Sequence, residues 1–91
     1  MRRLEEASIL SQTVVDLAPK DPQAWTVRGQ VGDGKKNPHG AIECYERVLR
    51  LDPTDTHAME LLALNYWKIG KTDKASEYKT KLRSLGGYYT D

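Results

Sequence analysis

Apolar residues recur along the chain at spacings of three and four, between turns that contain proline or glycine. Residues 3–17 carry one such stripe, whose members are Leu4, Ala7, Leu10 (or Ser11), Val14 and Leu17. This spacing predicts an amphipathic helix, and Pro19 ends it because proline cannot continue a helix.

Two further helices are predicted to begin at a polar residue followed by proline. Asp21 precedes Pro22 and Asn37 precedes Pro38, a pairing that suits a helix start because the first-turn N–H groups have no partners within the helix. The helix from Pro22 should end or fray near 31–32, because each glycine in a helix interior costs about 1 kcal/mol relative to alanine. The helix opened by Asn37 should run to 51, before Asp52 and Pro53.

The C-terminal half predicts two more helices. Asp55 or Thr56 should cap a helix over 57–69, which Gly70 ends in the position just past the last turn. Thr72 should cap a last helix over 73–85, which the glycines at 86–87 end. The β-branched residues never alternate over the length of a strand, so the sequence predicts an all-α chain of five helices.

The chain repeats itself with a shift of 34 residues. This shift aligns Leu17–Asp21 with Leu51–Asp55. It also brings together two sets of apolar residues, which are Ala7, Ala41 and Ala75, and Val14, Val48 and Leu82. A fixed period of this length is typical of repeat architectures, in which each unit buries its apolar face against its neighbours. Equivalent residues should therefore occupy matching interior positions.

The repeated residues resemble the tetratricopeptide repeat, a helix–turn–helix unit of the same period. The matching residues within 22–55 are Trp25, Gly29, Ala41, Tyr45, Val48 and Pro53. Those within the second unit are Leu62, Ala63, Tyr66, Gly70, Ala75 and Leu82. The resemblance implies a single domain over 1–91, made of a half repeat (3–21), a repeat (22–55), a repeat with the C-terminal end (56–87) and a tail (88–91). Its implied fold is a short right-handed α-solenoid of five stacked helices.

The sequence departs from the family pattern in two places, and each departure leads to a structural expectation. Arg28 and Gly32 replace a leucine and a tyrosine, so the helix from Pro22 should bury less than usual. The stem of Arg28 should lie along the core while its charge stays in water. Lys79 and Arg83 stand where the preceding repeat has an aromatic and a leucine, which suggests that the array ends there.

The helix over 57–69 carries the main candidate site. Its core stripe is Ala58, Leu62, Tyr66 and Ile69, and a second stripe is His57, Glu60, Leu64 and Trp67. In the family this second face lines a concave groove that binds extended peptides, with Gln23, Thr26 and Gln30 as the equivalents one repeat earlier. Alternatively, the leucine and the tryptophan of the stripe pack on the preceding repeat.

The resemblance implies a non-catalytic scaffold that binds a protein or peptide partner. Co-chaperone members hold terminal carboxylates with Lys, Asn and Arg, but the matching positions here are Thr26, Val27, Gln30, Glu60, Leu61 and Leu64, so that ligand is not expected. An alternative is self-association through the uncovered N-terminal end of the stack. The last helix is locally basic and could favour an acidic partner.

Charge and composition narrow the class of protein further. The formal net charge is +1, which argues against nucleic-acid binding because phosphate recognition needs a clustered positive excess. No apolar run approaches the roughly 18 residues of a membrane span, and no signal peptide is apparent. The single cysteine excludes an internal disulfide. We expect a soluble, cytoplasmic protein.

Candidate catalytic and metal-binding motifs are weak. Residues 29–36 come close to a phosphate-binding P-loop, but Lys36 stands where Ser or Thr is needed and no strand precedes the motif. His39, Glu43 and Cys44 could share a helix face, yet no second cluster completes a metal site. We therefore expect no metal, no cofactor and no enzymatic activity.

Overall fold

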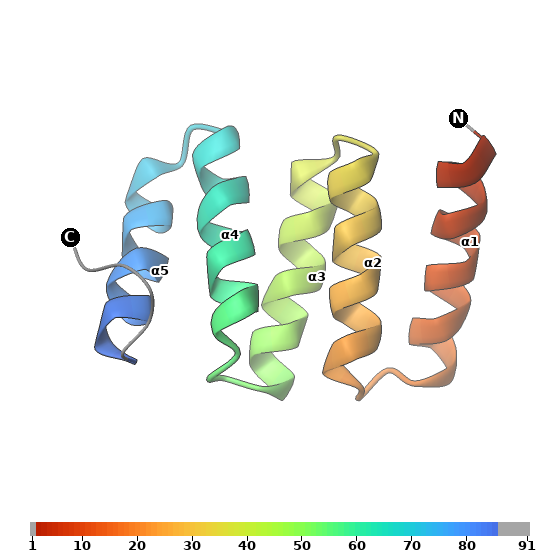
Figure 1. Cartoon of the computed structure of the whole chain (residues 1–91), viewed down its shortest axis with the longest axis horizontal. Helices are drawn as coiled ribbons and strands as arrows, with labels where there is room; N and C mark the ends of the chain where they lie inside the picture. The colour runs from red at the N-terminus through yellow and green to blue at the C-terminus, as the bar shows by residue number, and fades with distance from the viewer. Residues whose placement is uncertain (1, 86–91) are drawn as a thin grey trace.

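The computed structural model describes residues 2–85, which form five helices and, within that range, no strand. They are α1 (Arg2–Leu17), α2 (Pro22–Gly34), α3 (Pro38–Leu51), α4 (Thr56–Lys68) and α5 (Thr72–Ser84). The helices lie side by side in chain order from α1 to α5 (Figure 1). The molecule measures 40 × 26 × 17 Å, and its shortest dimension is below two helix diameters of about 10–12 Å each. The predicted all-α solenoid is confirmed.

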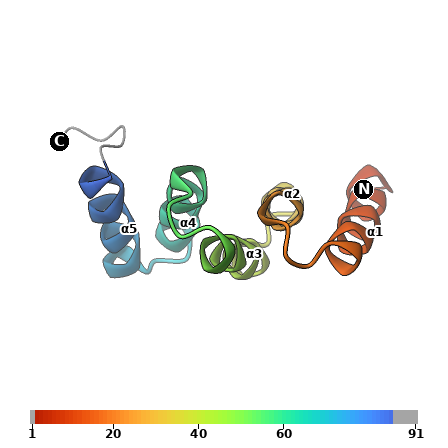
Figure 2. The same cartoon turned by 90° about the horizontal axis from the view of Figure 1, so that it is seen from below.

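Each helix packs mainly on its neighbours in sequence. The contacting pairs are α1 with α2, α2 with α3, α3 with α4, and α4 with α5. Viewed along the helices, α3 is displaced to one side of the line through α2 and α4 (Figure 2). The row has two ends, so α1 and α5 each have a neighbour on one side only among the described helices. This arrangement decides which apolar faces are covered.

The side-chain caps explain where three of the helices begin. Asp21 Oδ1 accepts a hydrogen bond from Gln23 N at 3.0 Å, and Asn37 Oδ1 accepts one from Gly40 N at 3.1 Å. Asp55 Oδ1 accepts from Ala58 N at 3.0 Å, which identifies Asp55 as the cap of α4. The prediction that Thr72 caps α5 is wrong, because Thr72 is the first residue of the helix and Lys71 precedes it without a side-chain cap.

The expectation that α2 ends near residue 31 is also wrong, since the helix continues to Gly34. Its glycines allow close packing instead of breaking the helix. A Cβ on Gly29 would lie 2.8 Å from Tyr45 Cδ1 and closer still to Cε1. A Cβ on Gly32 would lie 3.1 Å from the backbone N of Ala41. These contacts bring α3 close against α2, and the packing outweighs the low helix propensity of glycine.

The ends of α2 and α4 share one backbone motif, 34 residues apart. After α4, Lys71 N donates to Tyr66 O at 2.8 Å and Gly70 adopts a φ of +82°, which confirms its predicted place past the last turn. After α2, Asn37 N donates to Gly32 O at 2.8 Å. The left-handed position there is held by Lys36, with a φ of 57°. Both are Schellman ends, so the repeat extends to the turns.

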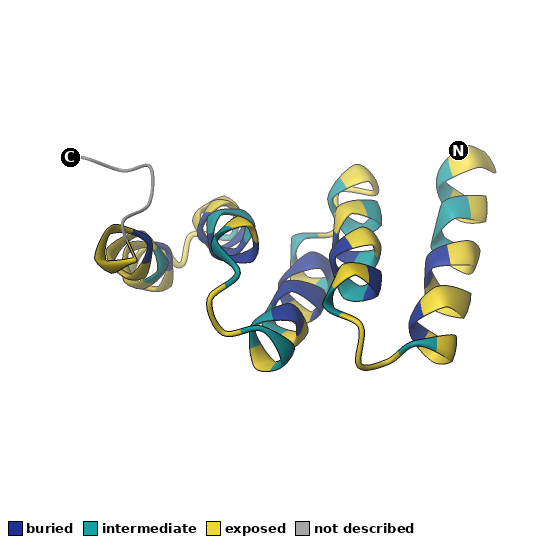
Figure 3. Cartoon of the chain, turned by 60° about the horizontal axis from the view of Figure 1, so that its bottom comes forward, coloured by how far each residue is buried: buried dark blue, intermediate teal, exposed yellow. Residues whose placement is uncertain are grey.

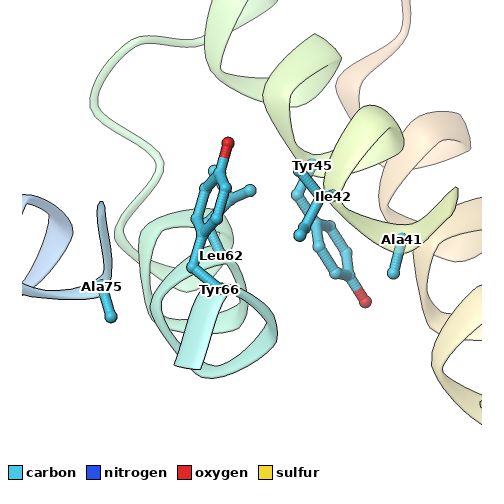
Figure 4. Close-up of a cluster of buried hydrophobic side chains, with 6 residues drawn as sticks. All are labelled: Ala41, Ile42, Tyr45, Leu62, Tyr66 and Ala75. Carbon is cyan, nitrogen blue, oxygen red and sulfur yellow. The ribbon is translucent and has the colours of Figure 1, made fainter. Parts of the chain in front are cut away.

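The core joins three consecutive helices. Ala41, Ile42 and Tyr45 of α3 gather with Leu62 and Tyr66 of α4 and Ala75 of α5 (Figure 4). Ala41 and Ala75 are both buried, as the repeat predicts. The hydroxyl of Tyr45 donates to Asp33 Oδ2 at 2.6 Å, and that of Tyr66 donates to Glu46 Oε2. Burial and these hydrogen bonds raise the pKa of both tyrosines, so both remain donors near neutral pH.

The predicted stripe of α1 is only partly correct. Ser11 and Val15 are its buried residues, whereas Leu10, Val14 and Leu17 are exposed, Val14 by 46% and Leu17 by 82%. The face of α1 that meets α2 is therefore rotated from the predicted one (Figure 3). Val48 and Leu82, which the repeat equates with Val14, are fully buried in helices that have an earlier helix against them. Val14 has no such neighbour among the described helices.

Arg28 differs from expectation as well. Its guanidinium Nη1 donates to Ser8 O at 2.9 Å and to Ser11 Oγ at 3.1 Å, so the charged group binds α1. Arg28 thereby joins α2 to α1, where the family pattern has a leucine. The predicted glycine stop at 86–87 and the tail at 88–91 lie outside the described residues.

Candidate functional site

The second stripe of α4 lies at the surface of the molecule. We call His57, Glu60, Leu64 and Trp67 the α4 face. Leu64 is 47% exposed and Trp67 is 64% exposed, whereas Ala58, Leu62 and Tyr66 on the core stripe are buried. The alternative that Leu64 and Trp67 pack on the preceding repeat is therefore wrong. Since α4 buries its other side in the core, its large exposed apolar residues are concentrated on this face.

Three residues of the α4 face line a pocket of about 330 Å³ between α4 and α5. The lining of this α4–α5 pocket is Glu60, Ala63, Leu64, Trp67, Ala75 and Lys79. Ala63, Ala75 and Lys79 were not predicted as site residues from the sequence. The small residues that the repeat places at 63 and 75 were a signal for two of them, whereas Lys79 joins the pocket because α5 packs beside α4. The small side chains leave space beside the indole.

The α4–α5 pocket combines an apolar centre with charges of both signs. Glu60 and Lys79 lie on different helices, and Leu64 and Trp67 supply the apolar surface. His57 Nδ1 lies 3.9 Å from Glu60 Oε1, so a protonated imidazole would pair with this carboxylate. An aromatic side chain within a polar frame is typical of the centre of a protein-binding surface.

The residues of α2 that the repeat makes equivalent to the α4 face contribute less to the candidate site. Gln23 and Gln30 are exposed, but Thr26 is only 7% exposed, and its hydroxyl donates to Pro22 O at 3.0 Å. None of the three lines the α4–α5 pocket. The two glutamines are accessible at the surface of α2, while Thr26 offers little surface to a partner.

The weak motifs gain no support from the structure. Residues 29–34 are the last turns of α2, so no strand leads into the glycine-rich segment. Over residues 2–85, no group of three or more His, Cys, Asp and Glu side chains is placed to hold a metal ion. Burial raises the pKa of the Cys44 thiol, an effect that the charge of Arg28 opposes. A buried, protonated thiol is a poor metal ligand.

Within the described part of the chain, none of the helices combines the length and the apolar character that a membrane span requires.

Comparisons with known proteins agree with the repeat architecture. Residues 22–55 match the family model of the tetratricopeptide repeat. The peroxisomal targeting signal receptors of Komagataella phaffii and Komagataella pastoris are each 32% identical to the chain over 89 residues. The match covers 98% of this chain and 15% of each receptor, so the chain spans only a small part of these relatives.

Proposed function

Because the chain belongs to the tetratricopeptide-repeat family, we propose that it is a non-catalytic module that binds a peptide or protein segment along its α4 face. The observation that carries this proposal is the exposure of Leu64 and Trp67 in a pocket flanked by Glu60 and Lys79. Burying these side chains against a partner removes apolar surface from water, while the two charges orient the partner.

The relatives support the class of ligand. They are receptors for a peroxisomal targeting signal, and a region similar to this chain occurs in them. Gln23 and Gln30 are exposed and hold the repeat positions of His57 and Leu64, so we propose that their side-chain amides donate to and accept from the backbone of an extended segment. A peptide lying across α4 and α2 fits this arrangement.

The proposal predicts that Trp67→Ala weakens peptide binding without unfolding the domain. Peptides selected from a random phage-displayed library on the wild-type chain should bind this variant at least about tenfold more weakly, because an indole anchor is lost. Its free energy of unfolding should change by less than about 0.5 kcal/mol, since the side chain is mostly exposed. Ile9→Ala removes an exposed apolar residue from α1 and is the matched control, expected to bind normally. Equal affinity of all three chains would contradict the proposal.

A second candidate function rests on α1. Leu10, Val14 and Leu17 are spaced by four and three residues and exposed together, which leaves an apolar helix face uncovered at one end of the row. We propose as the alternative that this end pairs with another copy of the chain. Sedimentation equilibrium over a range of concentrations should then show a dimer, and Val14→Glu should return it to a monomer. A wild-type chain that is monomeric at every concentration would contradict this alternative.

A further inference from the structure

A larger pocket, of about 540 Å³, lies between α3 and α5 and shares no lining residue with the α4–α5 pocket. We call it the α3–α5 pocket. Its volume falls within the range of roughly 300–1,000 Å³ that is typical of ligand-binding pockets. The basic character of the last helix was apparent from the sequence, but the pocket was not, because its residues come from three separate helices, the turn before α4 and the residue after α5.

The apolar part of this pocket is formed by Leu49, Met59, Tyr78 and Leu85. Met59 is buried, and the ring of Tyr78 stacks on that of Tyr66 with 5.9 Å between centroids and 8° between planes. Tyr66 is itself held by its hydrogen bond to Glu46. The aromatic wall is thus fixed before any ligand arrives, which reduces the entropy lost on binding.

The charged part of the pocket is mainly basic. Arg50 and Lys81 line it and are both exposed, and within residues 2–85 neither forms an ion pair with an acidic side chain. Lys81 Nζ lies 4.9 Å from the centroid of the Tyr78 ring, which places this ammonium directly over the aromatic wall. The acidic member, Glu46, already accepts the hydroxyl of Tyr66. Two cations that have no carboxylate partner within residues 2–85 therefore flank the apolar surface.

We propose that the α3–α5 pocket binds an acidic peptide segment of a partner protein. An aromatic or long aliphatic side chain of the segment packs on Leu49, Tyr78 and Leu85, and its carboxylates pair with Arg50 and Lys81. Arginine and lysine so placed attract carboxylates and raise the rate of encounter with an acidic chain. This proposal is independent of the α4 face, because the two pockets are lined by different residues.

The test is a titration of the full chain with a short fluorescent peptide in which two tyrosines precede a run of glutamates. Binding should weaken as salt rises, because the contributing charges are exposed. Methyl resonances of Leu49 and Met59 should shift on binding. Replacing the glutamates by lysines, or the tyrosines by alanines, should abolish measurable binding. Equal binding of the tyrosine-free peptide would show that the apolar surface is not used and would overturn the proposal.

Charge-reversal variants of the protein are a second test of this proposal. Lys81→Glu should weaken binding of the acidic peptide about fivefold, and the double variant with Arg50→Glu at least about tenfold. Lys74→Glu is the matched control, since Lys74 is an exposed lysine of α5 outside the pocket, and it should bind like the wild type. An equal loss of affinity in the Lys74→Glu control would show that only the net charge of the chain matters, and it would overturn the proposed site.

The same methyl spectra would reveal any other occupant of the α3–α5 pocket. Shifts of the Leu49 and Met59 methyls with protein concentration alone would assign the pocket to a second copy of the chain. Shifts caused by deleting residues 86–91, with none on adding the peptide, would assign it to the chain's own C-terminal end. Either result overturns the binding of a partner peptide at this site.

Discussion

Replacing Tyr45 with alanine is expected to lower the free energy of unfolding by about 4 kcal/mol, the range for removing a large aromatic side chain from a core. Tyr45 is fully buried, belongs to the core that joins α3 to α4, and contacts Gly29 on α2. A domain of this size has a total stability of about 5–15 kcal/mol, so the variant should be close to unfolding at room temperature. Urea denaturation followed by circular dichroism measures the change.

Tyr45→Phe separates the ring from its hydroxyl. It keeps the packing but removes the donor to Asp33 Oδ2, and we expect a loss of about 1–2 kcal/mol from the unpaired, partly buried carboxylate. The alanine variant should therefore be much less stable than the phenylalanine variant. A loss below about 1 kcal/mol for Tyr45→Ala would contradict the central packing role assigned to this residue.

Gly29→Ala is the second variant with a large expected effect on the free energy of unfolding. The direction of the change is opposite to that expected from helix propensity. Alanine in a helix interior is favoured over glycine by about 1 kcal/mol. The new Cβ, however, would lie less than 3 Å from several ring atoms of Tyr45, whose hydroxyl is held by Asp33. Such overpacking costs about 1–3 kcal/mol and occasionally more, so we expect a net destabilisation of about 2 kcal/mol.

Two controls test this explanation in the same denaturation experiment. Gly34→Ala makes the identical change in the same helix, where the nearest neighbour is the flexible tip of Leu4, and it should alter stability by less than about 0.5 kcal/mol. In a Tyr45→Leu background, the cost of Gly29→Ala should largely disappear, because the ring that it meets is gone. An unchanged cost in that background would mean that the ring is not the cause.

The repeat period allowed most of the fold to be predicted from sequence. The caps at Asp21 and Asn37, the left-handed Gly70 and the buried pair Ala41 and Ala75 depend on local geometry or on periodicity, and both can be read directly from the residues. The length of α2 could not be predicted in this way. Its glycines disfavour helix locally, and only the close approach of Tyr45 and Ala41 from the next helix shows why the helix continues.

The faces of the terminal helices were harder to predict, because burial there depends on which neighbours are present. Leu10 and Val14 are as apolar as buried residues in α3 and α5, yet among the described helices α1 packs mainly on α2. The guanidinium of Arg28 was expected in water. It instead donates hydrogen bonds to Ser8 and Ser11 of α1, which lie 20 and 17 residues earlier in the sequence. Such polar contacts between helices leave no periodic signal.

The candidate site was predicted in part. The α4 face follows from helical spacing, which placed Glu60, Leu64 and Trp67 together. The contribution of α5 depends on how the second helix of the repeat packs beside the first, and Lys79 joins the pocket for that reason. Spacing alone also could not show that Thr26 is covered, because its burial comes from the packing around α2.

The most direct test of the proposed interaction surface is a nuclear magnetic resonance titration of the isotope-labelled chain with a library-selected peptide. We expect the largest shifts at the indole N–H of Trp67 and at the backbone amides of Glu60, Leu64 and Ala75. Shifts concentrated on α1, with the Trp67 indole unchanged for every selected peptide, would contradict this surface.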